Sequence, residues 1–179
     1  MEGLTIVHTG NGKGKTTAAL GLALRAVGWG KRVLIIQFLK TRVSGEIKAL
    51  QKIQEKLEIG NWKLEIEQYG TREFVDPKKL RPVDFKEAHR ALKSAMLHVS
   101  SSMFNVVILD EINVAIKFGL VRLKEVLDLI KSKPAEVDLV LTGRGAPKEI
   151  LKVSDLVTEF VEIKHPYKMG KKAKQGVDY

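Results

Sequence analysis

The sequence predicts an α/β domain in which helices cover both faces of a mainly parallel β-sheet. Apolar runs typical of strands buried on both faces recur along the chain, as in "RVLIIQF" and "NVVILDE". Between them lie segments whose apolar residues recur at helical spacing. A chain of 179 residues can bury one substantial core, so residues 1–179 are expected to form a single domain. Strands alternating with helices favour a three-layer arrangement with right-handed crossovers.

The N-terminal half of the sequence supplies two strand–helix pairs and a third strand. Residues 4–7 form a short apolar run, and Ala and Leu recur at helical spacing over 16–27 until glycines end the pattern. The run at 32–38 predicts a buried parallel strand, and a short helix is expected at 46–56. Residues 63–69, "KLEIEQY", alternate between apolar and polar, which is typical of an edge or half-exposed strand.

The C-terminal half begins with an irregular stretch at 70–82, whose length indicates a functional loop. Residues 83–99 then place their apolar side chains on one helical face. Four further elements follow from the same patterns: a buried strand at 105–111, a helix at 123–131, a buried strand at 137–143 and a last strand at 156–163.

The composition limits the classes of protein that the chain can represent. The absence of cysteine excludes disulfides, thiolate metal sites and cysteine nucleophiles. No apolar run approaches the roughly 20 residues of a membrane-spanning helix and no leader is evident, so a cytoplasmic location without membrane contact is expected. The net charge of +10 predicts an anionic partner. The basic stretch at about 164–179 is interpreted as a solvated tail, with nucleic-acid binding less favoured because aromatic residues are sparse.

Residues 9–17, "TGNGKGKTT", join the first predicted strand to the first predicted helix and are typical of a phosphate-binding loop. The usual spelling is G-x-x-x-x-G-K-[ST], but Thr9 stands where the first glycine belongs, so the loop is one residue short. Its glycines let backbone N–H groups and the positive helix end approach an anion. Lys15 is expected to bind bridging phosphate oxygens, and Thr16 to ligate Mg²⁺. The motif makes the predicted fold that of a P-loop NTPase-like (RecA-like) domain.

Two neighbouring acids, Asp110 and Glu111, end the predicted buried strand "VVILDE". A strand that carries carboxylates to the rim of the sheet places them where Mg²⁺ on bound phosphates would lie. Adjacent residues of a strand point apart, so one acid is expected to hold the metal directly and the other to contact a water molecule or Lys15. The alternative is a chain that simply returns to solvent after a buried strand.

Other polar and aromatic residues are less specific. Arg144 follows a predicted strand in "TGRGAP", where it either faces the phosphates or pairs with a surface carboxylate. The four histidines show no spacing typical of metal ligands. Trp29 and Trp62 are interpreted as packing residues.

Four stretches together resemble the ATP:cob(I)alamin adenosyltransferases of the corrinoid adenosyltransferase family: "TGNGKGKTTAALGLALRAVGWGKRVLIIQFLK", "VVILDEINVAIKFGLV", "LTGRGAPKEILKVSDLVTE" and "KHPYKMGKKAKQGVDY". The resemblance runs from about residue 4 to Tyr179. Its most specific marks are the short loop G-N-G-K-G-K-T-T and the lysine-rich ending of the form K-x-x-x-G-x-[DE]-[YF].

The resemblance implies transfer of the 5′-deoxyadenosyl group of ATP to the Co(I) of a reduced corrinoid, either cob(I)alamin or cob(I)yrinic acid a,c-diamide, with release of triphosphate. This reaction serves adenosylcobalamin synthesis or salvage. In the family the nucleotide is understood to lie reversed relative to other P-loop enzymes, with its terminal phosphate in the loop. The resemblance also implies Mg²⁺ or Mn²⁺ as cofactor, a homodimer, and an acidic reductase such as a flavodoxin as partner.

The resemblance further assigns roles to individual positions. Lys13 and Lys15 are expected to stabilise the departing triphosphate, and Asn11 to reach the ribose. The metal is expected near Thr16, Asp110 and Glu111. The nucleotide- and corrinoid-binding residues that the resemblance implies are Gly10, Asn11, Gly12, Lys13, Gly14, Lys15, Thr16, Thr17, Arg25, Phe74 and Arg144.

Two departures from the family pattern concern the corrinoid side of the site. Some relatives carry an aromatic-x-aromatic pair after the third strand that displaces the lower cobalt ligand. Here "YGTREFVDP" offers Phe74 but has Asp76 at the second position. Some relatives also begin with an N-terminal helix that covers the active site, whereas this sequence reaches its first predicted strand almost at once.

Two other classes of function stay open at the level of sequence. A RecA-like ATPase acting on nucleic acid would share the glycine loop, the acidic strand and the positive charge, and it would form ADP. A regulatory protein would bind ATP without consuming it when reduced corrinoid is supplied.

Overall fold

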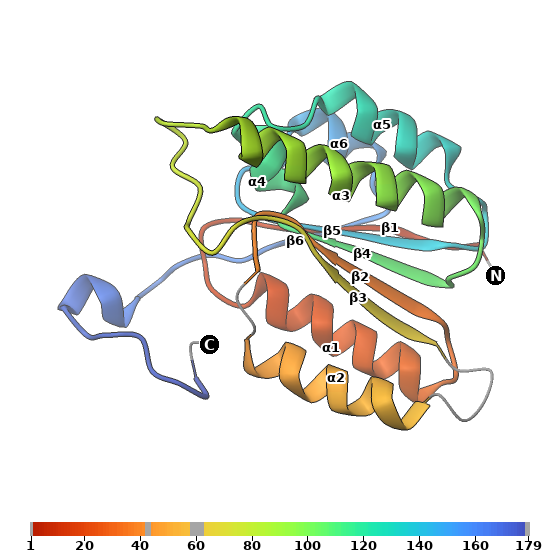
Figure 1. Cartoon of the computed structure of the whole chain (residues 1–179), viewed down its shortest axis with the longest axis horizontal. Helices are drawn as coiled ribbons and strands as arrows, with labels where there is room; N and C mark the ends of the chain where they lie inside the picture. Colours follow the sequence, from red (N-terminus) through yellow and green to blue (C-terminus); the bar gives the residue numbers. More distant parts are fainter. Residues whose placement is uncertain (1, 42–43, 58–62, 178–179) are drawn as a thin grey trace.

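A six-stranded sheet forms the centre of the protein, and every strand pairing in it is parallel (Figure 1). The computed structural model of the chain describes residues 2–41, 44–57 and 63–177. The strands lie in the order β3-β2-β4-β5-β1-β6. Their bounds are β1 (Thr5–Thr9), β2 (Val33–Gln37), β3 (Leu64–Gln68), β4 (Val106–Asp110), β5 (Asp138–Thr142) and β6 (Leu156–Glu159). The predicted α/β fold with a mainly parallel sheet is confirmed.

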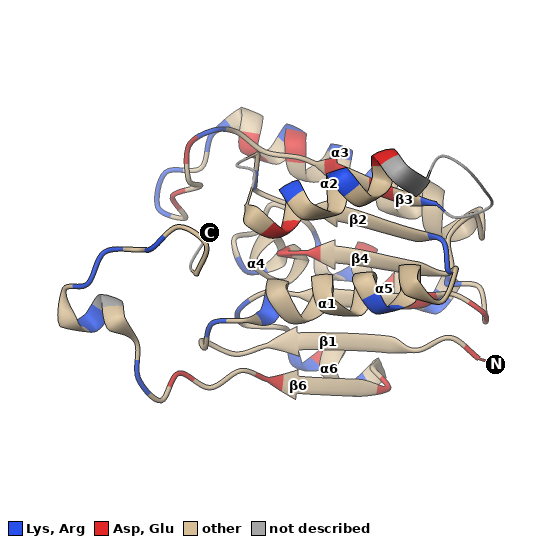
Figure 2. Cartoon of the chain, turned by 90° about the horizontal axis from the view of Figure 1, so that it is seen from below, with Lys and Arg blue, Asp and Glu red and all other residues tan. Residues whose placement is uncertain are grey.

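Helices cover both faces of the sheet (Figure 1). One layer consists of α1 (Lys15–Gly28) and α2 (Gly45–Leu57), and the other of α3 (Pro82–Ser100), α4 (Ile112–Lys117), α5 (Leu123–Ser132) and α6 (Lys148–Val153). After β6 the chain leaves the sheet, carries recurring Lys residues and forms a short 3₁₀ helix, η1 (Pro166–Met169) (Figure 2). Within the described ranges, no helix is long and apolar enough to cross a membrane.

Two hydrophobic clusters, one on each face of the sheet, form the core. Successive residues of β2 alternate between them: Leu34 and Ile36 pack with residues of α3 and α5, whereas Val33 and Ile35 pack with residues of α1 and α2. All residues of β2 and β4 are buried because both faces are covered, which is why their apolar runs are uninterrupted in the sequence. Burying one such aliphatic side chain contributes about 1.5–3 kcal/mol.

The predicted strands and longer helices are found close to their predicted positions. β3 is an edge strand, as the alternation at 63–69 predicts. The helices α4 and α6 were not predicted, because each has six residues and fewer than two turns give no clear period. The interpretation of Trp29 as a packing residue is wrong, since its side chain is 83% exposed. Trp62 lies outside the described residues.

The strand order brings three strand ends together. β5 lies between β1 and β4, so the loop after β1, the end of β4 and the residues after β5 meet at one edge of the sheet. α1 begins at this same edge, directly after the loop that follows β1. Ligands of open parallel sheets bind beyond the carboxyl ends of the strands, so this edge is where a site is expected.

Candidate functional site

The loop between β1 and α1 is held in its curled shape by glycines and by the segment after β6. Gly10 and Gly14 have φ values of 92° and 110°, a left-handed region that favours glycine. The N–H of Gly12 donates to the carbonyl oxygen of Phe160 at 2.6 Å, and the N–H of Phe160 donates to that of Thr9 at 2.8 Å. The loop therefore packs backbone against backbone with the chain that leaves the sheet edge.

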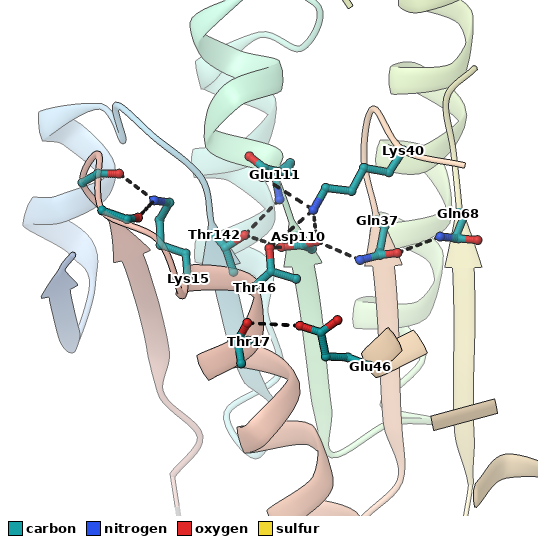
Figure 3. Close-up of polar contacts among 12 residues, drawn as sticks. Lys15, Thr16, Thr17, Gln37, Lys40, Glu46, Gln68, Asp110, Glu111 and Thr142 are labelled. Atoms are coloured by element: carbon teal, nitrogen blue, oxygen red, sulfur yellow. Dashed lines mark hydrogen bonds and ion pairs between the residues drawn. The ribbon is translucent and has the colours of Figure 1, made fainter. Parts of the chain in front are cut away.

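Lys15, the lysine of this loop, bends back onto the loop itself. Its ammonium donates hydrogen bonds to the carbonyl oxygens of Gly10 and Gly12 at 2.7 and 2.6 Å (Figure 3). Burial lowers the pKa of Lys15, and the positive charge of Arg144 lowers it further. The ammonium and the N-terminal end of α1 together make the loop electropositive, which favours an anion there.

Asp110 is the centre of a hydrogen-bond network that joins the loop to three strands (Figure 3). Its side chain is fully buried, and its carboxylate accepts from the hydroxyls of Thr16 and Thr142 at 2.8 and 2.7 Å. The amide of Gln37 and the ammonium of Lys40 donate to its second oxygen at 2.9 and 2.8 Å. Burial alone would raise the pKa of Asp110, but the Lys40 charge and these donors hold it below its usual value.

The register of the sheet explains why these polar groups meet. Gln68, Gln37 and Asp110 occupy paired positions at the ends of β3, β2 and β4. Gln68 donates to Gln37 at 2.8 Å, and Gln37 in turn donates to Asp110. The buried side chains of Gln37 and Asp110 thus have hydrogen-bond partners, which avoids the penalty of leaving them unsatisfied. The line of amides fixes the orientation of the Asp110 carboxylate.

Glu111 follows Asp110 in a left-handed conformation, with φ 67°. Its N–H donates to the Thr142 hydroxyl at 3.0 Å, so the same threonine that binds Asp110 also holds the Glu111 backbone. Its carboxylate lies 3.6 Å from the Lys40 ammonium. Burial and then the charge of Asp110 raise the pKa of Glu111.

Three predicted metal ligands therefore converge, as expected from the sequence. The Thr16 hydroxyl touches the Asp110 carboxylate, and one ammonium contacts Thr16, Asp110 and the Glu111 carboxylate (Figure 3). Oxygen donors with two carboxylates among them suit a hard divalent cation such as Mg²⁺. The donor set of this chain fits the metal that the sequence predicts.

Lys40 is a charged member of the site that was not predicted from the sequence. Lys15 was the lysine expected beside the acids, yet its ammonium binds loop carbonyls, and Lys40 contacts both carboxylates instead. Burial alone would lower the pKa of Lys40, but the negative charges of Asp110 and Glu111 have the larger effect and raise it. The available signal was the position of Lys40 just after a buried strand, "RVLIIQFLK".

The loop and Glu111 line a cleft of about 870 Å³. That volume lies within the range of about 300–1,000 Å³ that is usual for ligand sites. The segment after β3 also lines the cleft, and its Phe74 has an 80% exposed side chain. Residues of the predicted set that line the cleft are Asn11, Gly12, Lys13, Gly14, Lys15, Thr16, Thr17, Phe74, Glu111 and Arg144.

Three residues of the predicted set do not line this cleft. Gly10 shapes the loop from behind, and Asp110 lies buried beneath the Thr16 hydroxyl. Arg25 is exposed in the last turn of α1, about 15 Å along the helix from Lys15. The structure therefore does not bring Arg25 to the loop, and its expected contact with the nucleotide is not supported by its position.

Arg144 and Thr17 take up defined positions at the cleft. Arg144 lines it and lies near enough to Lys15 to lower that residue's pKa, and its charge also helps to lower the pKa of the Glu162 carboxyl, so both alternatives for this arginine stay open. The Thr17 hydroxyl donates to Glu46 of α2 at 3.1 Å. Thr17 thereby joins the N-terminal turns of α1 and α2 beside the cleft.

A second group of possible metal ligands lies outside the cleft. Single ligand atoms of Glu65, Glu67 and His98 lie within 4.8 Å of one another. Glu65 pairs with a neighbouring lysine at 2.7 Å, and Glu67 accepts hydrogen bonds from Ser94 and Tyr69. These protein partners account for the carboxylates without an ion. The sequence spacing of the histidines did not reveal this grouping.

Comparison with solved structures supports the fold. The structure is similar to a KaiC-like protein of Pyrococcus horikoshii, with a TM-score of 0.52 over 88% of this chain and 73% of that one. The two chains share 18% sequence identity, so the similarity concerns the fold alone. The P-loop NTPase-like fold predicted from the loop motif is confirmed.

Sequence comparison identifies closer relatives. Corrinoid adenosyltransferases of Pseudomonas aeruginosa and Escherichia coli are 36% and 35% identical, across 99% of this chain and 84% and 86% of theirs. An uncharacterized protein of Nostoc is 36% identical over 93% of this chain, which spans about half (46%) of that longer protein. The family model described as "ATP:corrinoid adenosyltransferase BtuR/CobO/CobP" matches residues 1–179. The chain therefore belongs to the ATP:corrinoid adenosyltransferase family.

Proposed function

We propose that the chain transfers the 5′-deoxyadenosyl group of ATP to the Co(I) of a reduced corrinoid and releases triphosphate. The electron pair of Co(I) forms the bond to C5′ while the bond between C5′ and the triphosphate oxygen breaks. The observation that carries this proposal is the one-residue-short glycine loop, which opens on a cleft of about 870 Å³ beside two carboxylates, in a chain of this family.

The residues of the loop suit the stabilisation of a departing anion. Co(I) carries no proton to remove, so the reaction needs no general base at the reacting atom. It needs positive charge and N–H donors around a triphosphate on which negative charge develops. Lys15, the N-terminal end of α1 and the loop N–H groups supply them, with Lys13 at the cleft wall. On binding, the triphosphate would replace the carbonyl oxygens that the Lys15 ammonium now contacts.

We assign the metal site to Thr16, Asp110 and Glu111, and the ion to Mg²⁺ or Mn²⁺. The contacts of one ammonium with all three side chains support this assignment. When bound, the ion would neutralise charge on the phosphates. Thr142 and Gln37 orient the Asp110 carboxylate through their hydrogen bonds, and such outer partners fix the geometry of metal ligands.

The reversed orientation of the nucleotide and the corrinoid site rest on the family resemblance. With the terminal phosphate in the loop, C5′ would face the part of the cleft that Phe74 lines. Phe74 offers an exposed ring to an apolar ligand, whereas Asp76 accepts the N–H of Lys78 at 2.9 Å and thus shapes a turn. Phe74 is therefore the aromatic residue of this segment that would contact the corrinoid, and Asn11 would reach the ribose.

The cellular setting follows from the same resemblance. We propose a cytoplasmic homodimer in which residues 1–179 form one domain. The net charge of +10 supports an acidic reductase, such as a flavodoxin, as the electron donor that keeps cobalt reduced. A pull-down with an acidic flavodoxin at low and high salt tests this partner, because contacts between exposed charges weaken as salt rises.

The products of one turnover test the proposed function. ATP and chemically reduced cobalamin are mixed with the protein without oxygen, and the phosphorus products are quantified next to the adenosylated corrinoid. Triphosphate and adenosylated corrinoid are expected in equal amounts. A parallel reaction with oxidised cobalamin and no reductant should yield neither. Stoichiometric ADP would instead assign the chain to ordinary ATPases or kinases, which are attacked at the γ-phosphorus.

A further inference from the structure

The ammonium of Lys40 stands among the groups that we assign to the metal (Figure 3). It lies 2.8 Å from Asp110 Oδ2, 3.6 Å from Glu111 Oε1 and 3.4 Å from Thr16 Oγ1. These oxygens come from the end of β4 and the start of α1, whereas Lys40 follows β2. A single positive group that follows β2 therefore lies between side chains from the end of β4 and the start of α1.

The backbone around Lys40 holds it in this place. Leu39 has φ 59°, an unusual left-handed conformation for a non-glycine residue. The N–H of Lys40 donates to the carbonyl of Tyr69 at 3.1 Å, which ties it to the end of β3. Gly70 packs so closely that a Cβ there would lie 2.7–2.8 Å from the backbone of Leu39 and Lys40. The fold thus directs this lysine toward the acids.

A divalent cation and an ammonium compete for the same carboxylate oxygens, because like charges at contact distance repel strongly where solvent is excluded. We propose that Lys40 is an internal counter-cation, which holds the metal position while the loop is free of nucleotide and leaves it when the metal binds. This inference rests on the proposed function only through the assignment of Thr16, Asp110 and Glu111 to the metal.

The cleft offers space for the displaced Lys40 side chain. Lys40 itself lines the cleft, and its side chain is 32% exposed on that side of the network. A triphosphate in the cleft would supply oxygens both to the metal and to the released ammonium. Metal and nucleotide therefore bind cooperatively, and the metal alone binds weakly because it must expel Lys40 without compensation.

Direct measurement of Mn²⁺ binding by electron paramagnetic resonance tests this inference without any turnover. The wild-type chain should bind Mn²⁺ weakly alone and more tightly with ATP in the absence of corrinoid. Lys40→Met removes the competing charge but keeps the length of the side chain. It should tighten nucleotide-free Mn²⁺ binding by roughly 5–150-fold, the usual range of coupling between two binding events.

Matched variants distinguish this effect from a general change in charge. Lys48→Met makes the same change at an exposed position of α2 and should bind Mn²⁺ like the wild type. Lys40→Arg keeps the positive charge, so its nucleotide-free Mn²⁺ binding should stay as weak as in the wild type. Adding Glu111→Gln to Lys40→Met should remove the gained affinity, which would place the tightened ion at this site.

Two outcomes would overturn the inference. One is tight Mn²⁺ binding by the nucleotide-free wild type that ATP does not improve, a measurement that needs no variant. The other is Mn²⁺ binding by folded Lys40→Met, or by Lys40→Gln if the first variant unfolds, that is no tighter than in Lys48→Met. Because these measurements use no corrinoid, they can fail while triphosphate is still released, or succeed while adenosyl transfer fails.

Discussion

The carbonyl oxygen of Phe160 accepts the N–H of Gly12 at 2.6 Å, so the segment after β6 closes one side of the glycine loop. A Cβ on Gly12 would lie 2.8 Å from backbone atoms of Phe160 and Val161. Since backbone atoms rather than a flexible side-chain end stand there, the loop has no room for a larger residue without moving. The shape of the loop therefore depends on a segment far away in the sequence.

Gly12→Ala should unfold more easily and bind ATP less well than the wild type. The added methyl group has to push the loop away from Phe160, and overpacking of this kind costs about 1–3 kcal/mol. Urea unfolding measures the stability, and equilibrium titration measures the affinity for ATP. The hydrogen bond between Gly12 and Phe160 would be lost in the same step.

Gly21→Ala is the matched control for this substitution. Gly21 is exposed in the middle of α1, and an added Cβ there would meet no atom within 4 Å. Alanine favours a helix interior over glycine by about 0.5–1 kcal/mol, so this variant should be slightly more stable and bind ATP normally. Equal behaviour of the two variants would show that the Phe160 contact does not constrain the loop.

Lys15→Ala should slow corrinoid adenosylation far more than Lys13→Ala. Lys15 is buried beside the loop carbonyls, and removing one well-placed stabiliser of developing charge costs on the order of 10²–10³ in rate. Lys13 is exposed, and a solvent-exposed charge contributes about 1 kcal/mol or less, so about fivefold is the expected loss. Single-turnover rates with reduced cobalamin measure the loss in each variant. Similar losses in both variants would remove the special role of Lys15.

The parts of the site that follow from local sequence were predictable. The glycine loop and the first residues of the helix that it precedes lie within one short stretch, Thr9–Thr17, so an anion site there can be predicted without knowing which strands are neighbours. The acids Asp110 and Glu111 were predictable because an apolar run ending in acid identifies the strand end. The loop is where the sequence predicts it, next to these acids at one sheet edge.

The remaining parts of the site depend on which strands are neighbours in the sheet. No local sequence pattern gives that information. Lys40 reaches Asp110 only because β2 lies beside β4 and because Leu39 turns the chain in a left-handed conformation. Phe160 supports the loop only because β6 pairs with β1. Arg25 is the opposite case, since the family resemblance assigned it to the nucleotide although the length of α1 separates it from the loop.

Glu111→Gln should raise the Mg²⁺ concentration needed for half-maximal activity by roughly tenfold or more, a size typical for losses at a metal site. Glutamine keeps the size of the side chain, and burial already raises the pKa of Glu111, so neutralising it should change the unfolding free energy by about 1 kcal/mol or less. Rates over a range of Mg²⁺ concentrations check this, next to thermal unfolding. Equal activity at every Mg²⁺ concentration would remove Glu111 from the site.

Phe74→Ala should leave ATP affinity unchanged and impair the use of corrinoid by roughly tenfold. A ring that bound corrinoid covers in part contributes on the order of 1.5 kcal/mol. The loss should be largest when cobalt must first be reduced from Co(II). Trp29→Ala removes an equally exposed ring outside the cleft and should have no such effect. If Phe74→Ala lowers ATP affinity as much as turnover, the ring supports the loop and does not contact the corrinoid.

The last prediction concerns acid stability and the pair formed by Asp110 and Lys40. The pKa of Asp110 is lowered in the folded chain, so unfolding takes up a proton once the pH approaches the unfolded value of about 3.9. The contribution of the pair is therefore complete above about pH 3.9 and is lost as the pH falls through the lower folded pKa.

Asp110→Asn should lower the unfolding free energy at pH 7 by on the order of 3 kcal/mol, because it leaves Lys40 beside a neutral group. The difference from the wild type should shrink as the pH falls below about 3.9, because the unfolded wild-type chain then takes up a proton that the folded Asp110 carboxylate does not yet bind. Asp128→Asn, at an exposed position of α5, makes the same charge change and should differ from the wild type by about 0.5 kcal/mol or less. Urea unfolding from pH 7 to pH 3 measures all three chains. If the difference in unfolding free energy between the wild type and Asp110→Asn stays constant over this range, packing and not the charge of the carboxylate stabilises the network.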